Sequence, residues 1–156
     1  MKVWVDADAC PGSVKEIVVR AACRRRVHAV FVANKSIRIP LSPYLSTARV
    51  GMGLDVADGH IARSAERGDL AVTADIPLAA ALVAKAVVVV DPRGRVFTEE
   101  NVGEALAVRN FMSELREGGV VTGGPSGFAA ADAHAFAASF DRELSRALRG
   151  VDTASR

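Results

Sequence analysis

The chain has 156 residues, of which 50% are hydrophobic and 24% charged, and its formal net charge is +2. This balance is typical of one globular domain and excludes an intrinsically disordered chain, while two cysteines are too few for a disulfide scaffold. The longest apolar run, residues 79–90, contains Lys85 and is shorter than the ~20 residues that a membrane helix needs. We therefore expect a cytoplasmic protein without a signal peptide or a membrane partner.

Apolar stretches of strand length alternate with segments of helical periodicity along the chain. The patterns predict strands at residues 1–5, 28–33, 69–73 and 86–90, and helices at residues 11–25, 54–67, 76–85, 101–116 and 128–148. Residues 44–50 fit either a strand or a helical turn. Residues 92–95 are typical of a turn, and residues 118–127 form a glycine-rich loop, which is either a lid or a plain connector. Alternating strands and helices predict an α/β fold with a mainly parallel sheet.

Aspartates follow the predicted strands at the point where each strand ends. Asp6 and Asp8 follow the first strand, Asp75 the third and Asp91 the fourth. In an open parallel sheet, this carboxyl edge is where ligands bind. Clustered carboxylates repel one another unless a cation is present, and carboxylate oxygens are preferred ligands of Mg²⁺ and Mn²⁺.

A second acidic pair, Asp55 and Asp58, lies three residues apart on a predicted helix and so shares one face. That helix leads into the strand before Asp75, so the three segments can converge on one acidic pocket. Single aspartates also have ordinary structural interpretations. These are helix caps for Asp8, Asp55, Asp58 and Asp75, and turn residues for Asp69 and Asp91.

Three long motifs resemble one family of small bacterial proteins. They are Val-Asp-Ala-Asp-Ala-Cys-Pro from Val5, the run Gly-Asp-Leu-Ala-Val-Thr-Ala-Asp-Ile-Pro-Leu-Ala from Gly68, and a late pattern that includes Arg109, Arg116, Gly124, Phe128, Asp132 and Phe136. Together with Asp58 and Ile61, these residues resemble the YaiI/YqxD family from Met1 to about Leu148. That family looks PIN-domain-like.

The resemblance implies a three-layer α/β/α sandwich. The sequence pattern itself predicts a single domain at residues 1–150 and a flexible tail at residues 151–156. The resemblance also implies a nuclease that depends on Mg²⁺ or Mn²⁺ and acts on RNA rather than DNA. Carried over by motif, Asp6, Asp58 and Asp75 are the metal-binding and catalytic aspartates. Asp8 belongs to this family's own motif and joins them as a ligand or as a residue that orients a ligand.

Other polar residues have a weaker pattern. Sixteen of the 20 basic residues are arginine, and Lys35, Arg38 and Arg49 are candidates for contacts with a nucleic-acid backbone, against the alternative of a solvated surface. Cys10 precedes a helix start and is expected to be a small buried thiol. Thr73 either orients a carboxylate or packs in its strand.

Two further functions compete with the nuclease. One is a non-catalytic nucleic-acid-binding or regulatory module on the same scaffold. The other is a phosphatase of the haloacid-dehalogenase type, suggested by Asp6, Asp8, Thr73 and Lys85, although its final acidic pair would have to follow Thr73. The apolar surface of the last helix either supports a homodimer or closes the chain's own core.

Overall fold

The computed structural model describes residues 1–53, 56–119 and 127–154. One sheet is built from the strands β1 (Lys2–Asp6), β2 (His28–Ala33), β3 (Leu45–Arg49), β4 (Leu70–Val72), β5 (Val88–Val90) and β6 (Val96–Phe97). Their order is β3-β2-β1-β4-β5-β6, and only β6 runs antiparallel to its neighbour. The predicted α/β fold with a mainly parallel sheet is confirmed.

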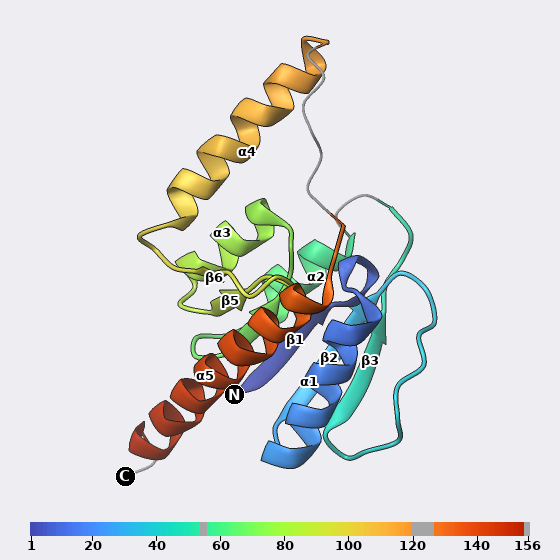
Figure 1. Ribbon diagram of the computed structural model, residues 1–156. Helices are drawn as coiled ribbons and strands as arrows, with labels where there is room; N and C mark the ends of the chain where they lie inside the picture. The colour runs from blue at the N-terminus through green and yellow to red at the C-terminus, as the bar shows by residue number, and fades with distance from the viewer. Residues whose placement is uncertain (54–55, 120–126, 155–156) are drawn as a thin grey trace.

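Helices cover both faces of this sheet, which makes the fold a three-layer α/β/α sandwich (Figure 1). The helices are the short 3₁₀ turn η1 (Ala7–Ala9) and the α-helices α1 (Gly12–Arg25), α2 (Val56–Ser64), α3 (Ile76–Ala84), α4 (Val102–Glu117) and α5 (Ala130–Ala154). α1 and α5 pack on one face, α2 and α3 pack on the other, and α4 packs on α3. No helix in residues 1–53, 56–119 and 127–154 has the length and hydropathy of a membrane span.

The two cores follow from the alternation of side chains along each strand. In β1, Val3 and Val5 point into the core with α1 and α5, while Trp4 points into the core with α2 and α3. Both kinds of position are buried because helices cover both faces, which explains why the strand sequences are almost wholly apolar.

The structure also departs from the sequence-based expectations. The ambiguous residues 44–50 contain the strand β3, and β6 follows the expected turn at residues 92–95, where no strand was predicted. The last helix continues to Ala154, beyond the expected end at residue 148 and into the residues expected to be a flexible tail. Asp55 and most of the glycine-rich loop, residues 120–126, lie outside the described residues.

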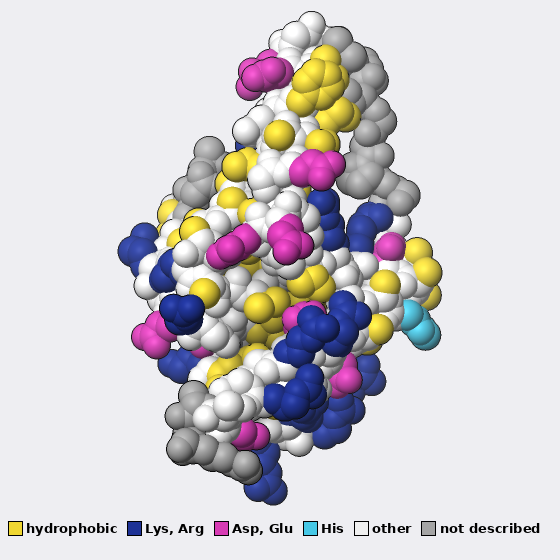
Figure 2. Space-filling model, turned by 90° about the vertical axis from the view of Figure 1, so that its left-hand side faces the viewer, with side chains coloured by type: hydrophobic (Ala, Val, Ile, Leu, Met, Phe, Trp, Pro, Cys, Tyr) yellow, Lys and Arg dark blue, Asp and Glu magenta, His cyan; other side chains and the backbone are white. Residues whose placement is uncertain are grey.

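The last helix closes the chain's own core, because Phe136, Phe140 and Leu144 of α5 are fully buried. Exposed large apolar side chains occur on α4, where Val108 is 57% exposed and Phe111 is 59% exposed, and at Val151 near the end of α5. α4 projects from the body of the molecule (Figure 1), and hydrophobic side chains are visible at the top of this projection in Figure 2. The homodimer stays a prediction.

Candidate metal and phosphate site

The candidate site lies where the strand order changes direction. The chain builds outward from β1 through β2 to β3, and then crosses to β4 on the other side of β1. The carboxyl ends of β1 and β4 therefore border a topological switch point, the usual position of ligand sites in open α/β sheets. Asp6 is the last residue of β1, and Thr73 directly follows β4. We call Asp6, Asp8, Thr73 and Asp75 the acidic site.

Hydrogen bonds link the two strand ends across the switch point. The Thr73 hydroxyl donates to Asp6 Oδ2 at 3.0 Å, and the backbone N–H of Asp75 donates to Thr73 Oγ1 at 3.1 Å. Asp75 in turn caps α3, since its Oδ1 accepts the N–H of Leu78 at 2.8 Å. Thr73 thus orients a carboxylate, and the capping interpretation of Asp75 is also correct.

The acidic site places a carboxyl group in an unfavourable environment. Asp6 is only 6% exposed, and burial raises its pKa above the ordinary value of 3.8. The hydrogen bond from Thr73 lowers the pKa, while the nearby charges of Asp75 and Asp8 raise it further. A bound cation would offset both the burial and the repulsion, so this environment suits a cation-binding group.

Asp8 lies on η1 and is exposed, and it ties the site to the segment that follows β2. Its Oδ2 accepts the N–H of Asn34 at 2.7 Å. This bond links residues 7–9 to the segment after β2, a contact that the sequence pattern did not reveal because the two residues lie 26 positions apart. The charge of Asp8 also acts on Asp6.

The predicted ligands do not form a closed metal cage. Across the described ranges, no three His, Cys, Asp or Glu side chains lie close enough together to hold a metal ion. Asp58 is half-buried in the first turn of α2, and the charges found to act on Asp6 are those of Asp75 and Asp8. Asp6 and Asp75 supply carboxylate oxygens, the donors that Mg²⁺ prefers, and an ion held by two carboxylates would keep water as its other ligands.

Three other aspartates have structural roles. Asp91 Oδ1 accepts the N–H groups of Arg93 and Arg95, both at 2.9 Å, and so forms the turn between β5 and β6. Asp132 accepts the N–H of Ala129 at the start of α5 and faces Arg93 at 3.9 Å. A turn does precede Asp69, since its N–H donates to the Glu66 carbonyl at 3.0 Å, but the expected surface position is wrong, because Asp69 is buried at 7% exposure.

Asp69 instead fastens the amino ends of β1 and β4 to each other. Its carboxylate accepts the N–H of Lys2 at 2.9 Å, the indole N–H of Trp4 at 3.0 Å and the N–H of Glu66 at 2.9 Å. Asp69 therefore lies at the sheet edge opposite the acidic site and satisfies three donors there.

The candidate nucleic-acid residues gather beside the acidic site at the ends of β2 and β3. Lys35 and Arg49 line one small cavity of about 100 Å³, and Arg49 donates to Ser36 Oγ at 3.3 Å. Arg38 lines the neighbouring larger cleft, which also contains Lys15 of α1. The structure brings these cations to the same sheet edge as Asp6, and their role in binding stays a prediction.

Neither Cys10 nor Lys85 supplies a polar group to the acidic site. Cys10 is buried, as expected, and burial raises the pKa of its thiol to about 12, with the charge of Asp6 acting in the same direction and that of Lys15 opposing it. Lys85 follows α3 at the end opposite Asp75, and its ammonium donates to the carbonyls of Ala62 and Ala65. Lys85 thus caps α2 instead of facing the acidic site.

Comparison with known proteins identifies the family. A model described as "Uncharacterized BCR, YaiI/YqxD family" matches residues 4–146. The UPF0178 protein of Myxococcus xanthus is 63% identical over 149 residues, which are 96% of this chain and 97% of the relative. The UPF0178 protein of Geobacter metallireducens is 53% identical, covering 96% of each chain, and that of Syntrophobacter fumaroxidans is 51% identical, covering 96% of this chain and 97% of its own. No solved structure matches. The chain belongs to the YaiI/YqxD family.

Proposed function

We propose that this member of the YaiI/YqxD family is a nuclease that hydrolyses phosphodiester bonds, in RNA rather than DNA, with the help of Mg²⁺ or Mn²⁺. The observation that carries the proposal is the arrangement of Asp6, Thr73 and Asp75 at the switch point. The ionised form of this buried carboxyl group beside two other acids is disfavoured, and carboxyl groups with such shifted pKa values gather at functional sites. The position of Asp6 therefore supports a role in cation binding.

In the proposed reaction, water attacks the phosphorus in line with the leaving oxygen. Asp6 and Asp75 would hold the divalent ion, which supplies an activated water and neutralises charge on the phosphate. Thr73 holds the carboxylate of Asp6 in one orientation, and the N-terminus of α3 fixes that of Asp75. Asp8 keeps the segment after β2 against the site through Asn34. Asp58 remains a candidate ligand through an intervening water.

The competing phosphatase hypothesis has less support. It requires a lysine beside the aspartates, whereas Lys85 lies at the other end of α3 and donates to carbonyls of α2. The non-catalytic binding module keeps one supporting observation, namely that the described residues hold no group of three metal-binding side chains. The following experiment separates that module from the nuclease.

The test combines Mn²⁺ calorimetry with an RNA cleavage assay on wild type, Asp6→Asn and Asp75→Asn. Asparagine retains the cap of α3 and the acceptor for Thr73, so folding is preserved while charge is lost. Asp141→Asn, on an exposed part of α5, is the matched control. In both site variants, we expect the Mn²⁺ affinity and the rate of RNA cleavage to fall about 100-fold or more. Both quantities should be unchanged in the control. Mn²⁺ binding without cleavage would indicate a binding module, and no binding at millimolar Mn²⁺ would overturn the proposal.

A further inference from the structure

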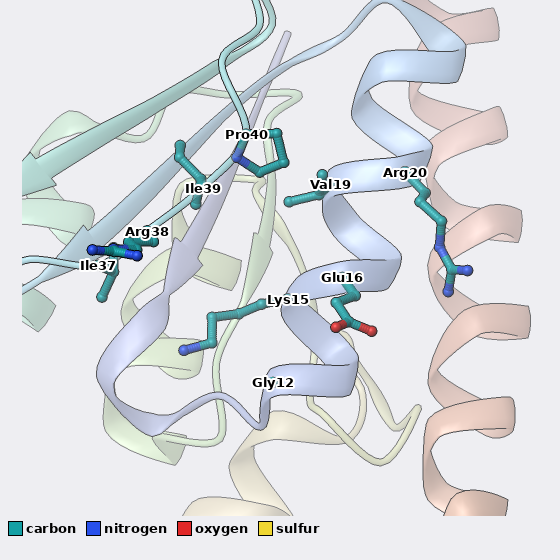
Figure 3. A pocket seen from close by; sticks show the side chains of 9 residues that line it. All are labelled: Gly12, Lys15, Glu16, Val19, Arg20, Ile37, Arg38, Ile39 and Pro40. Atoms are coloured by element: carbon teal, nitrogen blue, oxygen red, sulfur yellow. The ribbon is translucent and has the colours of Figure 1, made fainter.

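A cleft of about 560 Å³ lies between α1 and residues 37–40, a volume in the range of small-molecule sites. Figure 3 shows it from close by, with one wall formed by α1 and the other by the segment that follows β2. Its walls combine cations with aliphatic side chains. None of the acidic-site residues lines this cleft.

Two cations in the cleft are available for a ligand. Lys15 extends from α1 toward the segment that carries Ile37 and Arg38 (Figure 3). Among the residues with described positions, neither Lys15 nor Arg38 takes part in an ion pair or a side-chain hydrogen bond. Among the described residues that line the cleft, Glu16 is the only one with a carboxylate, and Arg20 points outward toward α5. Unpaired cations at the mouth of a cleft attract phosphate, and arginine binds it with two parallel hydrogen bonds.

The remaining lining is aliphatic. Val19, Ile37 and Ile39 are half-buried, and Pro40 is exposed at the rim, where it faces Val19 across the cleft (Figure 3). A flat, weakly polar ring can pack against such a surface and remove it from water. An aliphatic surface beside two unpaired cations matches a nucleotide, which has a planar base and an anionic phosphate.

Both walls of the cleft are connected along the chain to residues next to the acidic site. Gly12, which lines the cleft, begins α1 four residues after Asp8, and Ile37 follows Asn34 by three residues. The bond from Asn34 N–H to Asp8 Oδ2 therefore joins the two walls at the end nearest the carboxylates.

We propose that this nucleotide cleft holds the nucleotide next to the scissile phosphate, with Lys15 and Arg38 on its phosphate and with Val19 and Ile39 against its base. The inference rests on the proposed function, because it takes the acidic site as the place where the bond breaks. Under this inference, the cleft residues position the substrate, and contacts with the base as well as with the phosphate contribute to RNA affinity.

The test measures binding without cleavage. The full-length Asp75→Asn variant in EDTA is titrated against a fluorescein-labelled oligoribonucleotide, by fluorescence anisotropy. Adding Lys15→Gln and Arg38→Gln should weaken binding about tenfold and reduce the salt-dependence slope by about 0.7 for each lost phosphate contact. Arg67→Gln with Arg149→Gln removes the same charge from exposed positions outside the cleft and should change affinity less than twofold. Equal losses in both double variants would overturn the proposal.

A second comparison tests the base contact. An abasic oligonucleotide of the same length and charge should bind about tenfold more weakly than the base-containing one, and Ile39→Ser should remove this difference. Ile39→Ser also removes aliphatic surface that supports the fold. Photocrosslinking of 4-thiouridine RNA to the protein that retains Ile39 therefore provides a second measurement of the base contact. Crosslinks should map to residues 15–19 or 37–40. Equal affinity for both oligonucleotides, or crosslinks confined to other segments, would overturn the proposal.

Cleavage by the wild-type chain in Mn²⁺ separates the two hypotheses. If the wild-type chain binds RNA through the cleft without cleaving it, the nuclease proposal fails and the cleft assignment stands. If the wild-type chain cleaves RNA while the cleft variants bind and cleave like the control, the cleft assignment fails and the nuclease proposal stands.

Discussion

The Thr73 hydroxyl donates a 3.0 Å hydrogen bond to the carboxylate of Asp6, which joins the ends of two neighbouring strands at the switch point of the sheet. Both residues are buried, with Thr73 at 2% and Asp6 at 6% exposure. The bond favours the ionised form of a carboxyl group that its surroundings otherwise disfavour. Thr73 is therefore a positioning residue for any cation held by Asp6.

Replacing Thr73 by valine tests this role, because valine has the same shape without the hydroxyl. The pKa of Asp6 should rise further in Thr73→Val, since the only interaction found to lower it is lost. We expect Mn²⁺ affinity to fall about tenfold, as is usual when a group that orients a metal ligand is removed. Calorimetry measures the affinity, and Thr73→Ser, which keeps the hydroxyl, should retain it. An unchanged affinity in Thr73→Val would show that the bond does not support cation binding.

The raised pKa of Asp6 also predicts how stability depends on pH. Unfolded Asp6 titrates near 3.8 and folded Asp6 at higher pH, so its contribution to stability is present below 3.8 and is lost as pH rises through the folded pKa. Asp6→Asn cannot ionise, and we expect it to be more stable than wild type at neutral pH, with the difference disappearing in acid. Urea unfolding at both pH values measures this, and since most substitutions destabilise by about 1 kcal/mol, a gain in stability is diagnostic.

Metal binding should reverse the order of stability of wild type and Asp6→Asn at neutral pH. At a Mn²⁺ concentration 100-fold above its dissociation constant, a bound ion adds about 2.7 kcal/mol to the free energy of unfolding of wild type. Asp6→Asn should gain almost nothing, so wild type becomes the more stable protein. Thermal unfolding with and without Mn²⁺ shows the change, and equal stabilisation of both proteins would place the ion elsewhere.

The strand–helix alternation predicted the strands and α-helices up to residue 90 apart from β3, because the strands that helices cover on both faces are apolar, whereas β3 alternates between half-buried and exposed residues after its first residue. The strand β6 escaped prediction because it has only two residues and exists through its pairing with β5 across the Asp91 turn. The helix α5 continues past residue 148 through exposed residues, which carry no apolar pattern that could mark its end.

The candidate site was predictable in part. Aspartates at strand ends are visible in the sequence, and topology then brings Asp6 and Asp75 to neighbouring strand ends. The partners of these residues are not visible, since the contact of Asp8 with Asn34 and the nucleotide cleft both depend on where residues 34–40 pack. Asp69 was misjudged for the same reason, because Gly68-Asp69 is typical of a turn while two of its three donors lie at residues 2 and 4.

Removal of the Asp69 carboxylate should therefore destabilise the fold strongly. Asp69→Ala leaves the part-buried N–H groups of Lys2 and Glu66 and the buried indole N–H of Trp4 without their acceptor, and a buried donor without a partner is costly. We expect a loss of about 3 kcal/mol in the free energy of unfolding, measured in urea. Asp141→Ala is the control, because its exposed ion pairs with Arg24 and Arg25 contribute less than about 1 kcal/mol. Similar losses in the two variants would contradict the structural role of Asp69.

The Cys10 thiol should be unreactive in the folded protein, because burial raises its pKa to about 12 and thiolate is the reactive form. In a Cys23→Ser variant, Cys10 is the single thiol, and its reaction with a disulfide reagent at mildly alkaline pH reports on this site alone. We expect labelling at least about 100-fold slower than in the urea-unfolded chain. Rapid labelling of the folded variant would show that Cys10 is accessible as a thiolate.

Gly94 permits the β5–β6 turn to lie directly against α5. Its φ is +92°, and a Cβ built there would lie 2.6 Å from the carbonyl oxygen of Ala135. The same turn is held by the Ser139 hydroxyl, which donates to the Gly94 carbonyl at 2.6 Å. A side chain at this position therefore meets helix backbone, which cannot move aside without displacing α5 from the sheet.

We expect Gly94→Ala to lower the free energy of unfolding by more than about 2 kcal/mol, since the left-handed backbone adds strain to the clash. Gly103→Ala is the matched control, because its Cβ would meet nothing within 4 Å and it lies in the first turn of α4, where alanine stabilises by less than about 1 kcal/mol. Urea unfolding of both variants gives the comparison, with opposite signs expected. A neutral Gly94→Ala would mean that the turn can leave α5 at no cost, and the packing of α5 against the β5 edge would then contribute little to the fold.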